Sequence, residues 1–314
     1  MISPRLERAR KAAAGPMREL MTPNPKESYA PGEAPPVIAS RVLSAACFGA
    51  LLFVGWMLLA GWFHPSLEAL RGGPGSPGLL LYSLCLDAFA LGLSAVFLSA
   101  LDRQSFRALG LWLYPRWWFH AAAGTAVGAV TIGVVALAVS AWRGAGRAGI
   151  GAGHLPVVLA FFLLAAAFEE LMFRGYAWQR LAESLGVLPA TLISSVLFGL
   201  AHALNPGATR LSICNTVLAG GLMCVARWRS RALWMPLGLH LGWNLFLGPV
   251  CGYPVSGYQL SGSAAAARAT ASDWLTGGKY GLEGSVVLTV VAVASIVLLA
   301  CCPRKVLSPA DFQE

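Results

Sequence analysis

Long apolar stretches separated by short polar segments run along most of the chain. They are each roughly 17–28 residues long and lie near 41–63, 78–101, 117–141, 155–181, 188–204, 211–228, 231–249 and 283–302. A helix of about 20 apolar residues is long enough to cross the hydrocarbon core of a bilayer, which is ~30 Å thick. The pattern predicts an all-α polytopic membrane protein with about eight transmembrane helices packed as a bundle.

The polar segments define the predicted organisation. Residues 1–39 are basic and rich in proline, and no apolar core follows the first methionine closely, so we expect a disordered cytoplasmic tail rather than a cleaved signal peptide. Residues 40–304 form one integral membrane domain, and 305–314 form a short cytoplasmic tail. The segment 250–282 is too long for a simple turn, and its aromatic residues favour partial order on the outer face.

Composition and charge agree with a membrane protein. Of the 314 residues, 57% are apolar and 12% are charged, which leaves too few charges to cover a soluble globule. With the N-terminus inside, 17 of the 23 Lys and Arg residues lie on the inner side, so both termini are predicted to be cytoplasmic. The net charge of +9 reflects this bias, and no clustered basic face suggests nucleic acid as a partner. The seven cysteines are scattered and predict no metal site.

Three charged residues interrupt the fourth apolar stretch. Glu169 and Glu170 are adjacent, and Arg174 follows within the same stretch. An ionisable residue at membrane depth costs at least ~2.5–3.5 kcal/mol, so such residues usually face a polar cavity and serve a function. Glu170 and Arg174 are four residues apart on one helix face, which predicts a structural ion pair. Glu169 points about 100° away and is predicted to be the working acid.

Two further polar groups fall inside apolar stretches. His202 ends the fifth stretch, while His240 and Asn244 lie one helical turn apart in the seventh. If the fourth and fifth stretches form an antiparallel hairpin that turns near Gly186, Glu169 and His202 are equally far from the turn, at ~25 Å. His240 and Asn244 lie ~17–23 Å from the same face. We therefore expect four polar side chains to converge at one depth, nearer the outer leaflet.

The ordered motifs resemble the CPBP family, which comprises the CAAX proteases and bacteriocin-processing (Abi) proteins and includes the Ras-converting CAAX endopeptidase. They are Glu-Glu-x-x-x-Arg at 169–174, Phe-x-x-x-His at 198–202 and His-x-x-x-Asn at 240–244, with a possible extension at 252–257 and 274–278. The resemblance implies an eight-helix intramembrane endopeptidase of the glutamate type in a bacterial inner (plasma) membrane. It also implies that Glu169 and His202 activate the attacking water, that His240 and Asn244 stabilise the oxyanion, and that Glu170 and Arg174 support the site.

The resemblance implies a membrane-anchored or lipidated protein substrate, cleaved near a CAAX-type tail or a C-terminal sorting segment, and no cofactor. One alternative is a zinc protease in which Glu169, His202 and His240 bind the metal. Another is a membrane scaffold or immunity protein without catalysis. The sequence assigns no role to Asp87 in the second stretch, and it does not predict the oligomeric state.

Overall fold

The computed structural model describes residues 35–63, 77–143, 155–259 and 273–303. In these ranges the chain is helical, and the one pair with strand-like bonds is the isolated bridge between Val255 and Tyr258. The long helices are α2 (Pro35–Trp62), α4 (Pro77–Val96), α5 (Trp117–Arg143), α6 (Leu155–Arg174), α7 (Tyr176–Leu185), α8 (Val187–Ala201), α9 (Arg210–Ser230), α10 (Trp234–Leu245) and α12 (Val286–Cys301). Short helical segments are η2 (Phe97–Leu101), η3 (Phe106–Leu109), η5 (Phe246–Val250), α11 (Asp273–Thr276), η7 (Gly278–Tyr280) and η8 (Leu282–Gly284).

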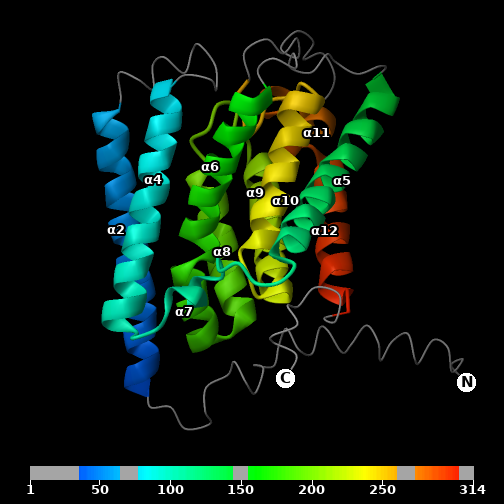
Figure 1. Ribbon diagram of the computed structural model, residues 1–314. Helices are drawn as coiled ribbons and strands as arrows, with labels where there is room; N and C mark the ends of the chain where they lie inside the picture. The colour runs from blue at the N-terminus through cyan, green and yellow to red at the C-terminus, as the bar shows by residue number, and fades with distance from the viewer. Residues whose placement is uncertain (1–34, 64–76, 144–154, 260–272, 304–314) are drawn as a thin grey trace, which may run out of the picture.

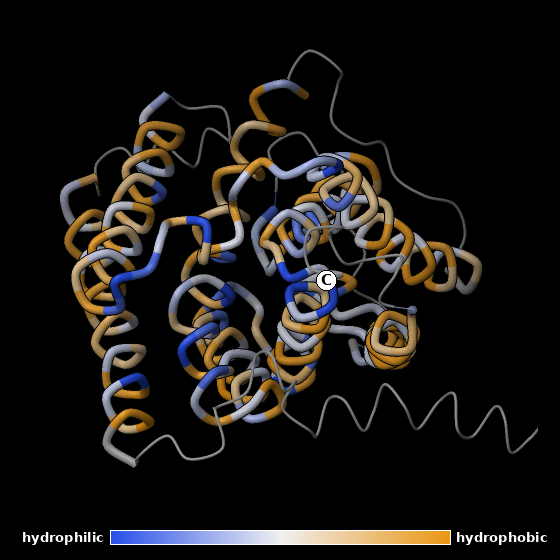
Figure 2. The backbone as a smooth tube through the Cα atoms, turned by 60° about the horizontal axis from the view of Figure 1, so that its bottom comes forward, coloured by the Kyte–Doolittle hydropathy of each residue, from blue (hydrophilic) through white to orange (hydrophobic). Residues whose placement is uncertain are grey.

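The predicted all-α membrane bundle is confirmed. Five helical segments of the described chain are long and apolar enough to cross a membrane, and α8 and α12 are shorter apolar helices. Each of the eight predicted stretches contains a helix. The π-helical turns η2 and η5 continue α4 and α10 toward the ends of their stretches. Large apolar side chains such as Leu58, Leu137 and Leu298 are about 70% exposed, as expected for helices surrounded by lipid. Figure 2 shows hydrophobic residues along the helices and hydrophilic stretches at the end turned toward the viewer.

The helices run up and down through the bundle (Figure 1). The first residue of α2 and the last residue of α12 lie at the same end. Helix α2 begins at Pro35, so residues 35–39 belong to the helix and not to the predicted tail. Proline fits the first turn of a helix because its missing N–H would have no partner there. The rest of the two predicted tails lies outside the described residues, and the cytoplasmic orientation stays a prediction.

The hairpin predicted between the fourth and fifth stretches is present, with one difference. Gly186 has a left-handed φ of +91° and joins α7 to α8 at the predicted turn. The fourth predicted stretch lies within one apolar span, Leu155–Leu185, whose helix is interrupted at Gly175 between α6 and α7. At this position a Cβ atom would lie 2.3 Å from the carbonyl oxygen of Leu171. Glycine therefore permits a backbone approach that re-aims the chain directly after Arg174.

Helices α5 and α10 pack backbone against backbone. Cβ atoms added at Gly124 and Gly128 of α5 would lie 2.1 and 2.0 Å from carbonyl oxygens of α10. Cβ atoms added at Gly238 and Gly242 of α10 would likewise lie 2.0 and 2.1 Å from carbonyl oxygens of α5. Gly124 and Gly128 form a GxxxG motif that serves helix packing here, and α10 supplies a matching pair. This contact fixes the helix that carries His240 and Asn244.

Candidate active site

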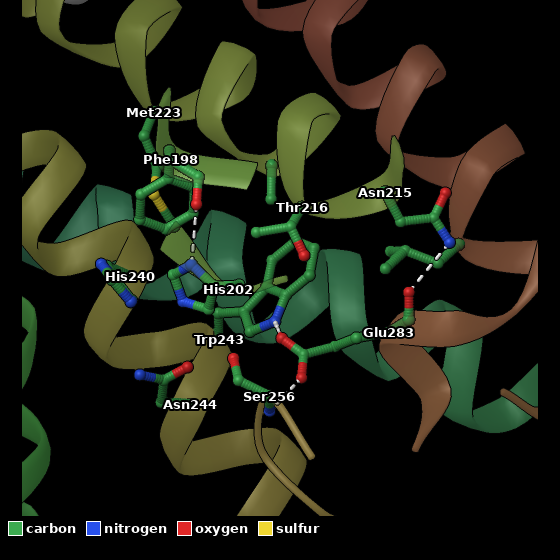
Figure 3. Close-up of a pocket in the computed structure, with 12 residues that line it drawn as sticks. Phe198, His202, Asn215, Thr216, Met223, His240, Trp243, Asn244, Ser256 and Glu283 are labelled. Carbon is green, nitrogen blue, oxygen red and sulfur yellow. Dashed lines mark hydrogen bonds between the residues drawn. The ribbon is translucent and has the colours of Figure 1, made fainter. Parts of the chain in front are cut away.

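Polar side chains from three helices meet near the end of the bundle where α8 and α10 finish. Glu169, Glu170 and Arg174 come from α6, His202 is the C-cap residue of α8, and His240 and Asn244 lie on α10. His202, His240 and Asn244 line a cavity of ≈ 20 Å³, which has room for about one water molecule (Figure 3). The structure thus brings together the residues that the sequence singled out.

Glu169 faces both histidines. Its Oε2 lies 3.9 Å from Nε2 of His202 and 3.7 Å from Nε2 of His240. This oxygen is buried and has no hydrogen-bond partner. Distances of this size are too long for direct hydrogen bonds but suit a bridging water. Glu169 Oε2 is therefore an acceptor within 4 Å of the Nε2 atoms of both imidazoles, and those two histidines also line the cavity.

The tautomer of His202 follows from its backbone contact. Its Nδ1 lies 2.8 Å from the carbonyl oxygen of Phe198, four residues earlier in α8. A carbonyl oxygen only accepts hydrogen bonds, so Nδ1 carries the proton. In the neutral ring Nε2 then presents its lone pair toward Glu169. A water between them can donate one hydrogen to the carboxylate and the other to the imidazole.

Glu170 and Arg174 form the expected ion pair, with 3.1 Å between Oε1 and the guanidinium. Arg174 is fully buried, donates to the carbonyl oxygen of Gly220 at 3.1 Å, and lies over the ring of Phe198 at 4.3 Å. Glu170 Oε1 also lies 2.9 Å from Nδ1 of His240. Sequence reasoning missed this last bond, through which Glu170, a member of the ion pair, orients the imidazole ring of His240.

Sequence reasoning also missed a third acid. Glu283, in η8, lines the same cavity and accepts hydrogen bonds from Trp243 Nε1 at 3.0 Å and from the backbone N–H of Ser256. Burial raises the pKa of this carboxyl group, while the two donated hydrogen bonds and the nearby histidines oppose the rise. No periodic pattern marks Glu283, since it lies in the long segment before the last helix.

A second cavity of ≈ 400 Å³ lies between α4, α6 and α10. Its walls are mainly apolar, with Leu84, Leu91, Leu164, Ala167 and Leu237 among them. Its polar members are Glu170 and Asp87, and both carboxylate oxygens of Asp87 are buried without a hydrogen-bond partner. Glu170 therefore stands between this apolar cavity and the polar site.

We expect Asp87→Leu to stabilise the protein. A buried carboxyl group without partners costs about 1–3 kcal/mol, and the cavity of ≈ 400 Å³ that Asp87 lines has room for the larger leucine side chain. The thermal unfolding midpoint of the purified variant in detergent should rise by a few degrees. A lower midpoint would show that Asp87 has a stabilising partner.

The remaining histidines lie elsewhere. His120 is buried and hydrogen-bonds Tyr114. His64 and His154 are outside the described residues.

The zinc alternative names Glu169, His202 and His240 as ligands. In the part of the chain that the structure describes, no group of three or more His, Cys, Asp or Glu residues is placed to hold a metal ion.

Comparison with known proteins identifies one family. Residues 151–246 match the family model described as type II CAAX prenyl endopeptidase Rce1-like. The match covers α6 to α10, which carry all six predicted site residues. The chain matches no curated protein and no solved structure.

Proposed function

We propose that this chain, which carries a CAAX-protease domain over residues 151–246, is an intramembrane endopeptidase whose general base is Glu169. The family itself supports a membrane endopeptidase. The observation that carries the finer proposal is the unpartnered Glu169 Oε2, which faces the Nε2 atoms of His202 and His240 at 3.9 and 3.7 Å.

In the proposed reaction a water molecule lies between Glu169 and His202. Glu169 takes one proton from this water as the oxygen attacks the carbonyl carbon of the scissile bond, and His202 accepts a hydrogen bond from the other. When the tetrahedral intermediate collapses, the proton on Glu169 passes to the leaving nitrogen. The peptide bond is thereby exchanged for a carboxylate and an amine, with water as the only co-reactant.

Asn244 and His240 are placed to stabilise the charge on the intermediate. Both side chains are more than 90% buried and line the cavity beside His202. The amide of Asn244 donates N–H, and His240 donates from Nε2 when that nitrogen carries a proton. The hydrogen bond from Nδ1 of His240 to Glu170 holds the ring in place. Each buried donor aimed at a developing negative charge typically raises the reaction rate by a factor of ~10²–10³.

The second cavity supports a substrate with an apolar group. Ligand sites are commonly apolar cavities of ~300–1,000 Å³ with few polar groups, and this cavity reaches Glu170, next to the proposed base. We propose that the hydrocarbon chain of a lipidated substrate, or the apolar side chains of a membrane-anchored tail, lies there. The peptide then crosses from this cavity toward Glu169.

The direct test is cleavage by the purified full chain in lipid vesicles. We expect it to cut peptides with a membrane-anchored or lipidated C-terminal region, to cut the soluble peptide more slowly, and to keep its activity in a metal chelator. Mass spectrometry would locate the cut. Loss of activity in the chelator with recovery on added zinc would favour the metal alternative, and absence of cleavage of every anchored substrate would favour the scaffold.

A further inference from the structure

A tight turn forms one wall of the polar cavity. Val255 and Tyr258 exchange two backbone hydrogen bonds, at 3.0 and 2.8 Å, around Ser256 and Gly257. Both central residues have left-handed φ angles, +48° and +87°. Left-handed backbone is unusual for serine, so the conformation of Ser256 has to be maintained by its surroundings. Ser256 faces the cavity opposite His202 in Figure 3.

The surroundings of Ser256 come from two other segments. Its backbone N–H donates to Glu283, and its carbonyl oxygen accepts from Nδ2 of Asn205 at 3.0 Å. At Gly257 a Cβ atom would lie 2.1 Å from the carbonyl oxygen of Pro206. The turn is thus pressed against the loop that follows His202 and is held by the segment that precedes α12.

Glu283 joins this turn to the helix that bears the oxyanion donors. One carboxylate oxygen accepts from Ser256 and the other from the indole of Trp243, the residue before Asn244. The Glu283 backbone is fixed in turn, because Nδ2 of Asn215 donates to its carbonyl oxygen at 2.9 Å. Figure 3 shows the Glu283 carboxylate between Trp243 and Ser256, at the cavity.

We infer that Glu283 is a positioning residue of the active site, which fixes the Ser256 wall and, through Trp243, the orientation of Asn244. This inference rests on the proposed function, because Asn244 is taken as an oxyanion donor. Glu283 does not touch the reacting atoms. Its carboxylate accepts two hydrogen bonds from two different elements, which a neutral amide of the same shape cannot do.

Glu283→Gln tests the inference with two readouts. We expect the glutamine oxygen to keep the bond from the Trp243 indole and its NH₂ group to face the Ser256 N–H, so the Ser256 bond is lost. We expect kcat to fall about tenfold or more, because a misplaced donor near the reacting atoms lowers the rate by up to ~10²-fold. KM should change less than about threefold. Hydrogen exchange of the peptide that contains residues 255–258 should become about tenfold faster, since the Ser256 amide loses its partner.

Trp243→Phe supplies a second variant in case the first does not fold. It removes only the indole N–H and should reproduce the kcat loss without faster exchange at Ser256. Combined with Glu283→Gln it should lower kcat no further than the larger single effect, because each change interrupts the same link from Ser256 through Glu283 to Trp243. Glu183→Gln, an acid-to-amide change on α7 away from the cavity, is the control: it weakens the ion pair with the buried Arg180 and should lower stability, but it should leave the kcat of the folded protein and the exchange of residues 255–258 unchanged.

The outcomes separate this inference from the proposed function. If wild-type protein cleaves, Glu169→Gln does not, and Glu283→Gln has wild-type kcat and exchange, the positioning role is wrong and the proposed function stands. If wild-type protein does not cleave any anchored substrate, the proposed function fails, and the exchange result alone decides whether Glu283 holds the turn. An additive kcat loss in the double variant would overturn the route through Trp243.

Discussion

Glu169→Gln should abolish proteolysis while leaving the protein folded. The amide cannot accept the proton of the attacking water, and general-base catalysis is worth ~10²–10⁴-fold. We expect the cleavage rate in vesicles to fall at least ~10³-fold. Stability should change little, because Glu169 Oε2 has no hydrogen-bond partner to lose and the side chain is 29% exposed.

The neighbouring glutamate provides the contrast for this experiment. Glu170 is 1% exposed, and its Oε1 contacts both Arg174 and His240. Glu170→Gln leaves the Arg174 charge buried without compensation, so it should lower the thermal unfolding midpoint as well as the rate. Glu183→Gln, which weakens the ion pair with the buried Arg180, should lower the midpoint without lowering the rate of the folded protein. If Glu169→Gln keeps more than a tenth of the wild-type rate, Glu169 is not the base.

Gly128→Leu should prevent the bundle from assembling. A Cβ atom at this position would lie 2.0 Å from the carbonyl oxygen of Leu239 and 2.8 Å from the backbone nitrogen of Trp243. Neither atom can rotate away as a side chain does, so helices α5 and α10 would have to separate. Overpacking even flexible cores costs ~1–3 kcal/mol, and a backbone clash costs more, against a total stability of only ~5–15 kcal/mol.

The measurement is the yield of monodisperse protein in detergent and its thermal unfolding midpoint. Gly92→Leu is the matched control, because it makes the same change in α4 where nothing lies within 4 Å of the added Cβ. It should express and unfold like the wild type. A Gly128→Leu protein with the wild-type midpoint would show that the close contact between α5 and α10 is not required.

Much of the bundle was predictable because hydrophobic length alone determines which segments can span a bilayer. The hairpin around Gly186 let residue counting place Glu169 and His202 at one depth, and their side chains approach to 3.9 Å. Counting cannot show how helices distant in sequence rotate against one another. The hydrogen bond between His240 and Glu170 was therefore missed. The glycines of α10 that pack against those of α5 were missed for the same reason.

The missed acid shows a different limit. Glu283 precedes an apolar helix, where an acid often serves only to favour the helix N-terminus. Its neighbours Ser256 and Trp243 are 27 and 40 residues away, and the intervening segment has no helical or strand period. Loop contacts of this kind depend on turn geometry and on glycines that allow backbone to approach backbone. Neither is readable from hydrophobic pattern.

The glycine contact between α5 and α10 has a consequence for how the site can open. Backbones in direct contact have no compressible side chains between them, so the two helices move as one body that carries His240 and Asn244. Glu169 and His202 belong to the other body, formed by the hairpin of α6, α7 and α8. If the two bodies separate to admit a substrate, the 3.7 Å distance between Glu169 and His240 increases. Under the proposed function, closure after substrate entry would bring Glu169 together with His240 and Asn244 in a single step.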